Sequence, residues 1–141
     1  MTYLVDTDVL IDYLRNMEGA ADYLDSIGDW TYSVVTAMEL ITGAANQKDV
    51  RKLEKILNDY REVPLSQEIG SRALELMKTH AKSDGLLPLD ALIAATALHE
   101  GVKLSTKNKN ISARSTGSIW KCRSIKSARL YHGSEGSLRV E

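Results

Sequence analysis

Three acidic residues that lie far apart in the chain, Asp6, Glu39 and Asp90, are the candidate catalytic groups of this sequence. Each is found where a short apolar run gives way to a helical pattern, or where a helix begins. Carboxylates brought close together repel one another unless a cation neutralises them, so a cluster of the three implies a divalent metal ion. Carboxylate and water ligands suit Mg²⁺ or Mn²⁺ better than zinc. Metal-bound water has a lowered pKa and can attack a phosphodiester, so the three residues indicate nuclease-like chemistry.

Each acid also has an ordinary structural explanation. Asp6 suits a helix N-cap or a turn, and Glu39 could close a Thr-x-x-Glu capping box. Asp90 stands at the start of a helix, where the helix dipole favours an acid. Asp8 is a plausible N-cap of the first helix, and Asp12 reads as a solvated helix residue. Taken singly, therefore, none of these residues requires a catalytic role.

Short apolar runs alternate with amphipathic segments through most of the chain. The predicted strands are residues 3–5, 30–35, 62–65 and 102–105, and the predicted helices are residues 8–14, 19–27, 36–44, 49–60, 66–84 and 89–100. This alternation favours an α/β protein with three α/β/α layers and a short, mainly parallel sheet. Active sites of such sheets lie at the carboxyl ends of the strands. That rule points to Asp6, to Thr36 with its helix, and to residues 105–108.

The charge is divided unevenly along the sequence. Residues 1–100 hold 17 acidic and 9 basic residues, a net charge of −8, whereas residues 101–141 hold 2 acidic and 9 basic residues, a net charge of +7. Phe is absent from the whole chain, and residues 107–141 show no sustained helix or strand period. We therefore predict a domain over residues 1–109, followed by an atypical basic tail over residues 110–141.

Several classes of protein are excluded by composition. A single cysteine, Cys122, excludes a disulfide framework and a cysteine metal cluster. No apolar run approaches the roughly 20 residues of a membrane span. The N-terminal residues lack a basic region and an apolar signal core, so we expect a cytoplasmic protein that does not bind membranes. The histidines have no metal-ligand spacing and read as ordinary surface or core residues; they are His80, His99 and His132.

Four segments together resemble the motifs of PIN-domain proteins. They are LVDTDVLIDYL at residues 4–14, TAMEL at residues 36–40, LPLDALIAATAL at residues 87–98 and LSTKN at residues 104–108. Within that superfamily they look most like the VapC toxins of VapBC toxin–antitoxin modules. The resemblance covers about residues 1–109 in the right order and spacing. The first and third segments are specific, whereas the second alone would not be.

The resemblance implies an Mg²⁺-dependent endoribonuclease, with Mn²⁺ as a possible substitute, that hydrolyses RNA with metal-activated water. It implies that Asp6 and Asp90 bind the metal and that Glu39 completes the site. It also implies RNA as substrate, a cognate VapB-type antitoxin as partner, and a homodimer. Supporting roles are implied for a second set of residues: Asp8, Thr106 and Asn108.

The chain departs from the family pattern after Asn108. Family members usually carry an acid or a His three residues further on, then Phe and a final strand, whereas this chain continues Lys-Asn-Ile-Ser. Codons read one frame out, from Lys109 onward, permit Lys-His-Phe-x-x-Ile-Asp-Gly-Leu-Asp-Leu-Glu-Val-Pro-Glu, which is the expected ending. We therefore expect a frame-shifted tail, with a missing or altered edge strand and one polar ligand lost. The nucleotide sequence decides between this hypothesis and an evolved basic RNA-binding extension.

Two other functions stay open. Asp6-Thr7-Asp8 also resembles the motif of haloacid-dehalogenase-type phosphatases, with Asp6 as nucleophile, Asp8 as acid/base and Lys107 as phosphate clamp. That family needs a further acidic pair after its lysine, and here only Glu135 and Glu141 follow. The other alternative is a catalytically impaired PIN-domain protein that binds its antitoxin without cleaving RNA.

Overall fold

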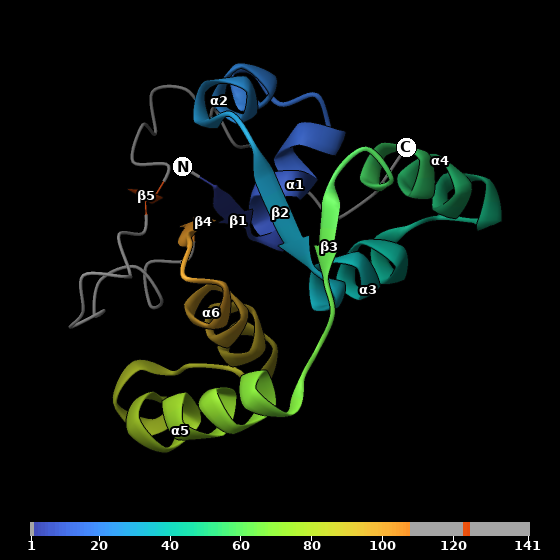
Figure 1. The fold of residues 1–141 in the computed structure, drawn as a ribbon. Coiled ribbons are helices and arrows are strands. Elements are labelled where there is room, and N and C mark those ends of the chain that lie inside the picture. The colour runs from blue at the N-terminus through green and yellow to red at the C-terminus, as the bar shows by residue number, and fades with distance from the viewer. Residues whose placement is uncertain (1, 108–122, 125–141) are drawn as a thin grey trace.

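The sheet is parallel throughout, as the alternating pattern predicts. A computed structural model describes residues 2–107 and 123–124. Its strands follow the order β3-β2-β1-β4-β5 across the sheet (Figure 1). The strands are β1 (Tyr3–Val5), β2 (Trp30–Ser33), β3 (Arg61–Val63), β4 (Lys103–Thr106) and β5 (Arg123–Ser124).

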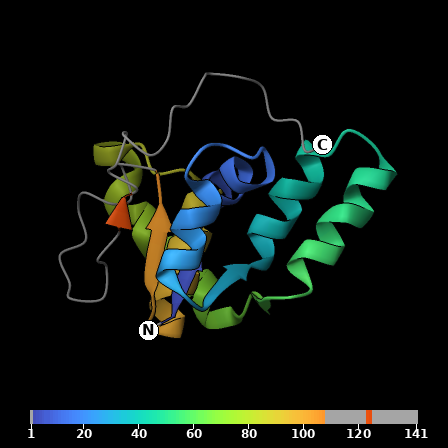
Figure 2. The same ribbon diagram turned by 90° about the horizontal axis from the view of Figure 1, so that it is seen from above.

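Helices cover both faces of this sheet. They are α1 (Thr7–Leu14), α2 (Ala20–Ile27), α3 (Val34–Gly43), α4 (Gln47–Leu57), α5 (Gln67–Asp84) and α6 (Pro88–Glu100). Figure 1 shows α5 and α6 together on one side of the sheet. Figure 2 shows α3 and α4 running side by side away from the sheet. No helix in the described part of the chain is long and apolar enough to cross a membrane.

Two hydrophobic cores form, one on each face of the sheet. In β1, Tyr3 and Val5 belong to the core beneath α1 to α4, whereas Leu4 belongs to the core beneath α5 and α6. Successive side chains of a strand point to opposite faces, and this is why a strand buried on both faces is apolar at every position. The predicted three-layer α/β/α architecture is thereby confirmed.

The alanine-rich sequence of α6 fits its place between the sheet and α5. Four of its alanines are buried in the second core, namely Ala91, Ala94, Ala95 and Ala97. Small side chains let a helix approach its neighbours closely, and α6 packs against both α5 and β4.

The register of the strands aligns their carboxyl ends. Val5 of β1 lies opposite Ser105 of β4, and the backbone N–H of Asp6 extends this ladder with a 2.8 Å hydrogen bond to the Ser105 carbonyl. The chain leaves β2 at Ser33 and enters α3 directly. We call the aligned ends of β1, β2 and β4 the carboxyl edge of the sheet.

Beyond β4, the described residues include one further strand. Arg123–Ser124 pairs in parallel with Ser105 and Thr106. The residues on either side of this pair are not described, so the missing or altered edge strand stays a prediction. The rest of the predicted tail lies outside the described residues, and the proposed boundary at residue 109 stays a prediction.

Candidate active site

Asp6 is the centre of the carboxyl edge. It is 5% exposed, and it caps α1 by accepting a 2.7 Å hydrogen bond from the Thr7 backbone N–H through Oδ1. Its other oxygen, Oδ2, accepts a 2.5 Å hydrogen bond from the Thr106 hydroxyl. Burial raises the pKa of Asp6 to about 6, against the lowering effect of these two hydrogen bonds, and the charges of Asp90 and Glu39 raise it further. Asp6 therefore interacts electrostatically with both of the other candidate acids.

Asp8 lies in the first turn of α1 and does not cap it. The prediction of Asp8 as N-cap is wrong, because the chain is already helical at Thr7 and Asp6 holds the extended conformation of a cap. Asp8 Oδ2 accepts a 3.1 Å hydrogen bond from the backbone N–H of Lys107, while Oδ1 is buried and has no hydrogen-bond partner. Burial, and then the charge of Asp6, raises the pKa of Asp8 to about 8.

Glu39 reaches the site from α3 through a threonine. Its Oε1 accepts a 2.8 Å hydrogen bond from the Thr7 hydroxyl, and the hydroxyls of Thr7 and Thr36 lie 3.1 Å apart. The capping-box alternative is wrong, because α3 begins two residues before Thr36 and is capped by Ser33, whose Oγ accepts from the Val35 N–H. Thr36 is instead a fully buried helix residue that faces α1.

Asp90 comes to the same neighbourhood on the first turn of α6. Pro88 occupies the start of this helix, and the N-cap Leu87 offers no side-chain hydrogen bond. The first turn thus favours a nearby carboxylate by its dipole, as the structural explanation of Asp90 supposed. The charge of Asp90 also raises the pKa of Asp6, so the two acids interact electrostatically.

The ligand atoms available at this edge are of the type that magnesium prefers, although the described acids do not form a group of three around one point. Among the described residues, no group of three or more His, Cys, Asp or Glu side chains is close enough to share an ion. The available donors are hard oxygens, and the unpartnered Asp8 Oδ1 and the raised pKa of Asp6 are features that a cation would relieve. The assignment of these carboxylates as metal ligands stays a prediction.

The last motif of the sequence is only partly in view. Thr106 lies at the carboxyl edge and contacts Asp6, whereas Asn108 lies outside the described residues. Lys107 Nζ pairs with Asp12 Oδ2 at 2.7 Å. The interpretation of Asp12 as a solvated helix residue is wrong, because Asp12 is 7% exposed and faces the end of β4.

Sequence reasoning missed the bridging role of Thr7 and the pairing of Asp12. Thr7 links two candidate acids, since its N–H donates to Asp6 and its hydroxyl donates to Glu39. The signal for Asp12 was its spacing: Asp8 and Asp12 are four residues apart and so share one face of α1.

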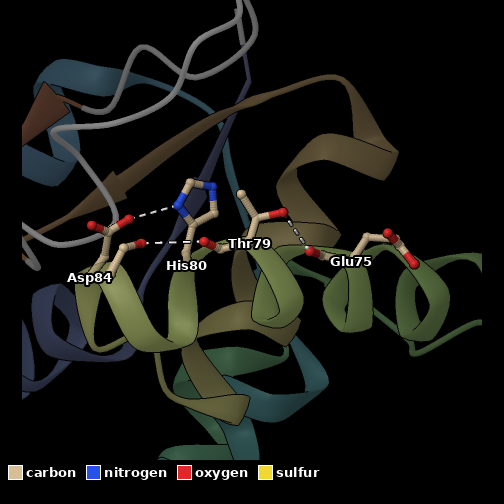
Figure 3. Close-up of polar contacts among 5 residues, drawn as sticks. Glu75, Thr79, His80 and Asp84 are labelled. Carbon is tan, nitrogen blue, oxygen red and sulfur yellow. Dashed lines mark hydrogen bonds and ion pairs between the residues drawn. The ribbon is translucent and has the colours of Figure 1, made fainter.

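The described histidines take no part in this site. His80 Nδ1 lies 2.7 Å from Asp84 Oδ2 on the last turns of α5, where Thr79 also donates to the carbonyl of Glu75 (Figure 3). His99 is exposed on α6, and His132 lies outside the described residues. The expectation of ordinary roles for His80 and His99 agrees with these positions.

The fold and the motifs together define the class of this protein. Residues 3–115 match the model of the PIN domain, so the chain belongs to the PIN-domain family. It is 38% identical over 109 residues to the ribonuclease VapC10 of Mycobacterium tuberculosis, a match that covers 74% of this chain and 81% of that protein. It is 35% identical over 112 residues to the ribonuclease VapC1 of Methanocaldococcus jannaschii, with 75% of each chain covered.

Solved structures show the same relationship. A chain of a toxin–antitoxin complex from Klebsiella pneumoniae superposes with a TM-score of 0.69 at 28% identity, covering 76% of this chain and 87% of that one. A chain of the FitAcB structure from Neisseria gonorrhoeae gives a TM-score of 0.63 at 27% identity, covering 77% and 88%. The three-layer fold and the order of the motifs are thus those of VapC-type PIN domains.

Proposed function

We propose that this chain is the toxin of a type II toxin–antitoxin module and acts as a metal-dependent endoribonuclease. The observation that carries this proposal is the environment of Asp6. Its carboxylate is buried at the carboxyl edge, and its pKa is raised to about 6 by burial together with the charges of Asp90 and Glu39. Burying the Asp6 carboxylate within range of the charges of two other acids costs stability, and a function that uses a cation accounts for that cost.

Asp6, Glu39 and Asp90 are the residues that would hold Mg²⁺ or Mn²⁺. A bound ion of this kind lowers the pKa of water and offsets the negative charge of a phosphodiester. The chain's own contribution is orientation. Thr106 and the Thr7 N–H each bind one oxygen of Asp6, and the Thr7 hydroxyl binds Glu39, so both carboxylates are held before substrate arrives.

The expected partner is a VapB-type antitoxin. The Klebsiella structure is a toxin–antitoxin complex, and this chain covers most of the matching chain. By that likeness we propose that the antitoxin binds this chain and controls its activity. The homodimer that the family resemblance implies stays a prediction.

RNA cleavage tests the proposed activity. The purified chain is incubated with total RNA and Mg²⁺ or Mn²⁺, next to Asp6→Asn and to Asp59→Asn, a matched change at an exposed position. We expect cleavage by the wild type and by Asp59→Asn, and its loss in Asp6→Asn and after addition of EDTA. Cleavage that survives Asp6→Asn unchanged contradicts the proposal.

One observation favours a second candidate, the impaired protein that binds antitoxin only. Within the described residues the acids are not gathered into a three-ligand group. Absence of cleavage by the wild type, with antitoxin still bound, supports this second function.

The phosphatase alternative is weaker, because Lys107 Nζ pairs with Asp12 rather than with Asp6 or Asp8. Hydrolysis of a phosphomonoester such as p-nitrophenyl phosphate, if it is lost in Asp6→Asn, would support the phosphatase function.

A further inference from the structure

Lys107 ties the end of β4 to α1 at two points. Its backbone N–H donates a 3.1 Å hydrogen bond to Asp8 Oδ2, and its ammonium group lies 2.7 Å from Asp12 Oδ2. Asp8 and Asp12 are four positions apart on α1, roughly one helical turn or about 6 Å along the axis. A single residue just after β4 is therefore held along a full turn of the first helix.

The acidic end of the ion pair in this connection is sheltered from solvent, whereas its lysine is partly exposed. The side chain of Asp12 is 10% exposed and that of Lys107 is 37% exposed. The pair between Lys78 and Glu75 on α5, by contrast, has side chains that are 62% and 72% exposed. Water and salt screen an exposed pair strongly and a sheltered one much less, so the Asp12–Lys107 pair is the stronger constraint.

The residue held next to this pair is the one that orients Asp6. Thr106 immediately precedes Lys107 and donates its hydroxyl to Asp6 Oδ2. A hydroxyl can keep such a short hydrogen bond only while the backbone that carries it stays in place. β1 pairs with β4 as far as Ser105, and Thr106 lies opposite Ser124 of β5. The next residue, Lys107, is held by Asp8 through its backbone N–H and by Asp12 through its ammonium group.

We propose that the Asp12–Lys107 ion pair is a latch that holds Thr106 on Asp6, and that Asp12 is a positioning residue for RNA cleavage. The contact that links Asp12 to this site is its ion pair with Lys107, the residue next to Thr106, so Asp12 acts through Lys107. The kinetic part of this inference rests on the proposed ribonuclease function. The structural part, the latch itself, does not.

A competing role for Lys107 is direct attraction of the RNA backbone. A lysine near the carboxyl edge can bind a phosphate as a point charge, and such a contact weakens as salt increases. In that role Lys107 matters to substrate binding, and Asp12 matters little. The two roles therefore predict different effects for changes at the two ends of the ion pair.

Hydrogen exchange measures the latch without RNA or metal. Exchange of the Lys107 backbone N–H is followed by NMR in the wild type, Asp12→Asn, Lys107→Met and Lys107→Arg, with Glu75→Gln as a control for loss of an exposed ion pair. We expect roughly tenfold faster exchange in Asp12→Asn and Lys107→Met, and near-wild-type exchange in Lys107→Arg and Glu75→Gln. Unchanged exchange in Asp12→Asn overturns the latch.

Kinetics then test the positioning role in variants shown by circular dichroism to be folded. Asp12→Asn should lower kcat roughly three- to tenfold with KM nearly unchanged. Lys107→Arg should keep most of the kcat that is lost in Lys107→Met. The double variant Asp12→Asn with Lys107→Met should be no slower than either single variant. A raised KM in Lys107→Met, with normal kinetics in Asp12→Asn, assigns Lys107 to RNA binding and overturns the proposal. If the wild type cleaves no RNA, the proposed function fails, while the exchange data still decide the latch.

Discussion

The hydroxyl of Thr106 donates a 2.5 Å hydrogen bond to Asp6 Oδ2, although 100 positions of sequence separate the two residues. Both side chains are buried, with exposed fractions of 0% for Thr106 and 5% for Asp6. A short hydrogen bond to an ionised carboxylate is among the stronger ones in a protein. The orientation of the central acid therefore depends on the correct pairing of the first strand with the fourth.

Replacing Thr106 by valine removes this donor while keeping the shape of the side chain. We expect a loss of about 1–3 kcal/mol in the free energy of unfolding, since a buried acceptor loses its partner. The pKa of Asp6 should rise further, because the hydrogen bond from Thr106 lowers it. NMR titration of the Asp6 carboxyl carbon and urea denaturation measure the two effects.

Thr96→Val is the matched control for this change. Thr96 is also fully buried, but its hydroxyl donates to the backbone carbonyl of Leu92 within α6. Its replacement should leave the pKa of Asp6 as it is in the wild type. An equal rise of that pKa in both variants would mean that Thr106 acts through general packing rather than through its hydrogen bond.

The stability of the folded protein should depend on pH, because two of its carboxyl groups have raised pKa values. Asp6 and Asp8 have pKa values of about 6 and about 8, above the ordinary 3.8. The folded state therefore holds these protons more tightly than the unfolded state does. Their contribution to stability is complete below about pH 3.8 and is lost as the pH rises through 6 and then 8.

We therefore expect the Tm of the metal-free protein to fall between pH 5 and pH 8.5, and Asp8→Asn to reduce that fall because a neutral amide does not titrate. Thermal unfolding followed by circular dichroism at constant ionic strength measures the slope. Asp59→Asn, an exposed change, should keep the wild-type slope. A slope in Asp8→Asn equal to that of the wild type contradicts the assignment of the effect to Asp8.

Much of this architecture was accessible from the sequence, because local periodicity decides it. The apolar run at β1 and the helical face that follows it depend only on residues close together in the chain. The rule that active sites lie at the carboxyl ends of parallel strands likewise points to Asp6, Thr36 and residues 105–108 from the sequence alone. Where several good caps stand close together, however, local pattern does not choose among them: Asp6 rather than Asp8 caps α1, and Ser33 rather than Thr36 caps α3.

The contacts between distant segments could not be predicted in the same way. Asp12 and Lys107 are 95 positions apart, and they meet only because β4 pairs next to β1 and ends beside α1. The double role of Thr7 is similar, since it depends on α3 lying against α1. Such pairs follow from the order of strands in the sheet, which hydrophobic periodicity does not contain.

Magnesium should stabilise the folded chain through Asp6. Binding to the folded state alone raises its stability by mass action, by about 2.7 kcal/mol at one hundred times the dissociation constant. We expect addition of MgCl₂ at pH 7.5 to raise the Tm of the wild type, EDTA to reverse the change, and Asp6→Asn to show little response. A KCl sample of equal ionic strength is the control for screening. Equal shifts in the wild type and Asp6→Asn would show that the ion binds elsewhere.

Two glycines, one at the end of α6 and one inside α5, offer a paired test of backbone conformation. Gly101 ends α6 with φ +65°, a left-handed conformation that disfavours side chains, and no atom would lie within 4 Å of an added Cβ. Gly101→Ala should therefore cost about 1 kcal/mol through backbone strain alone. Gly70 lies inside α5, also in open space, and Gly70→Ala should stabilise the protein by about 0.5–1 kcal/mol. Urea denaturation measures both, and changes of the same sign contradict this explanation.

The contact between His80 and Asp84 should matter more to stability than the exposed ion pair between Lys78 and Glu75 on the same helix. The side chain of Asp84 is 4% exposed, and His80 Nδ1 lies 2.7 Å from it (Figure 3). His80→Ala removes a partner from a buried carboxylate, so we expect a loss of about 1–3 kcal/mol in the free energy of unfolding. Lys78→Ala, which breaks the exposed pair with Glu75, should change stability by only about 0.5 kcal/mol. Urea denaturation compares the two, and equal losses would show that burial of Asp84 does not set the strength of its pair.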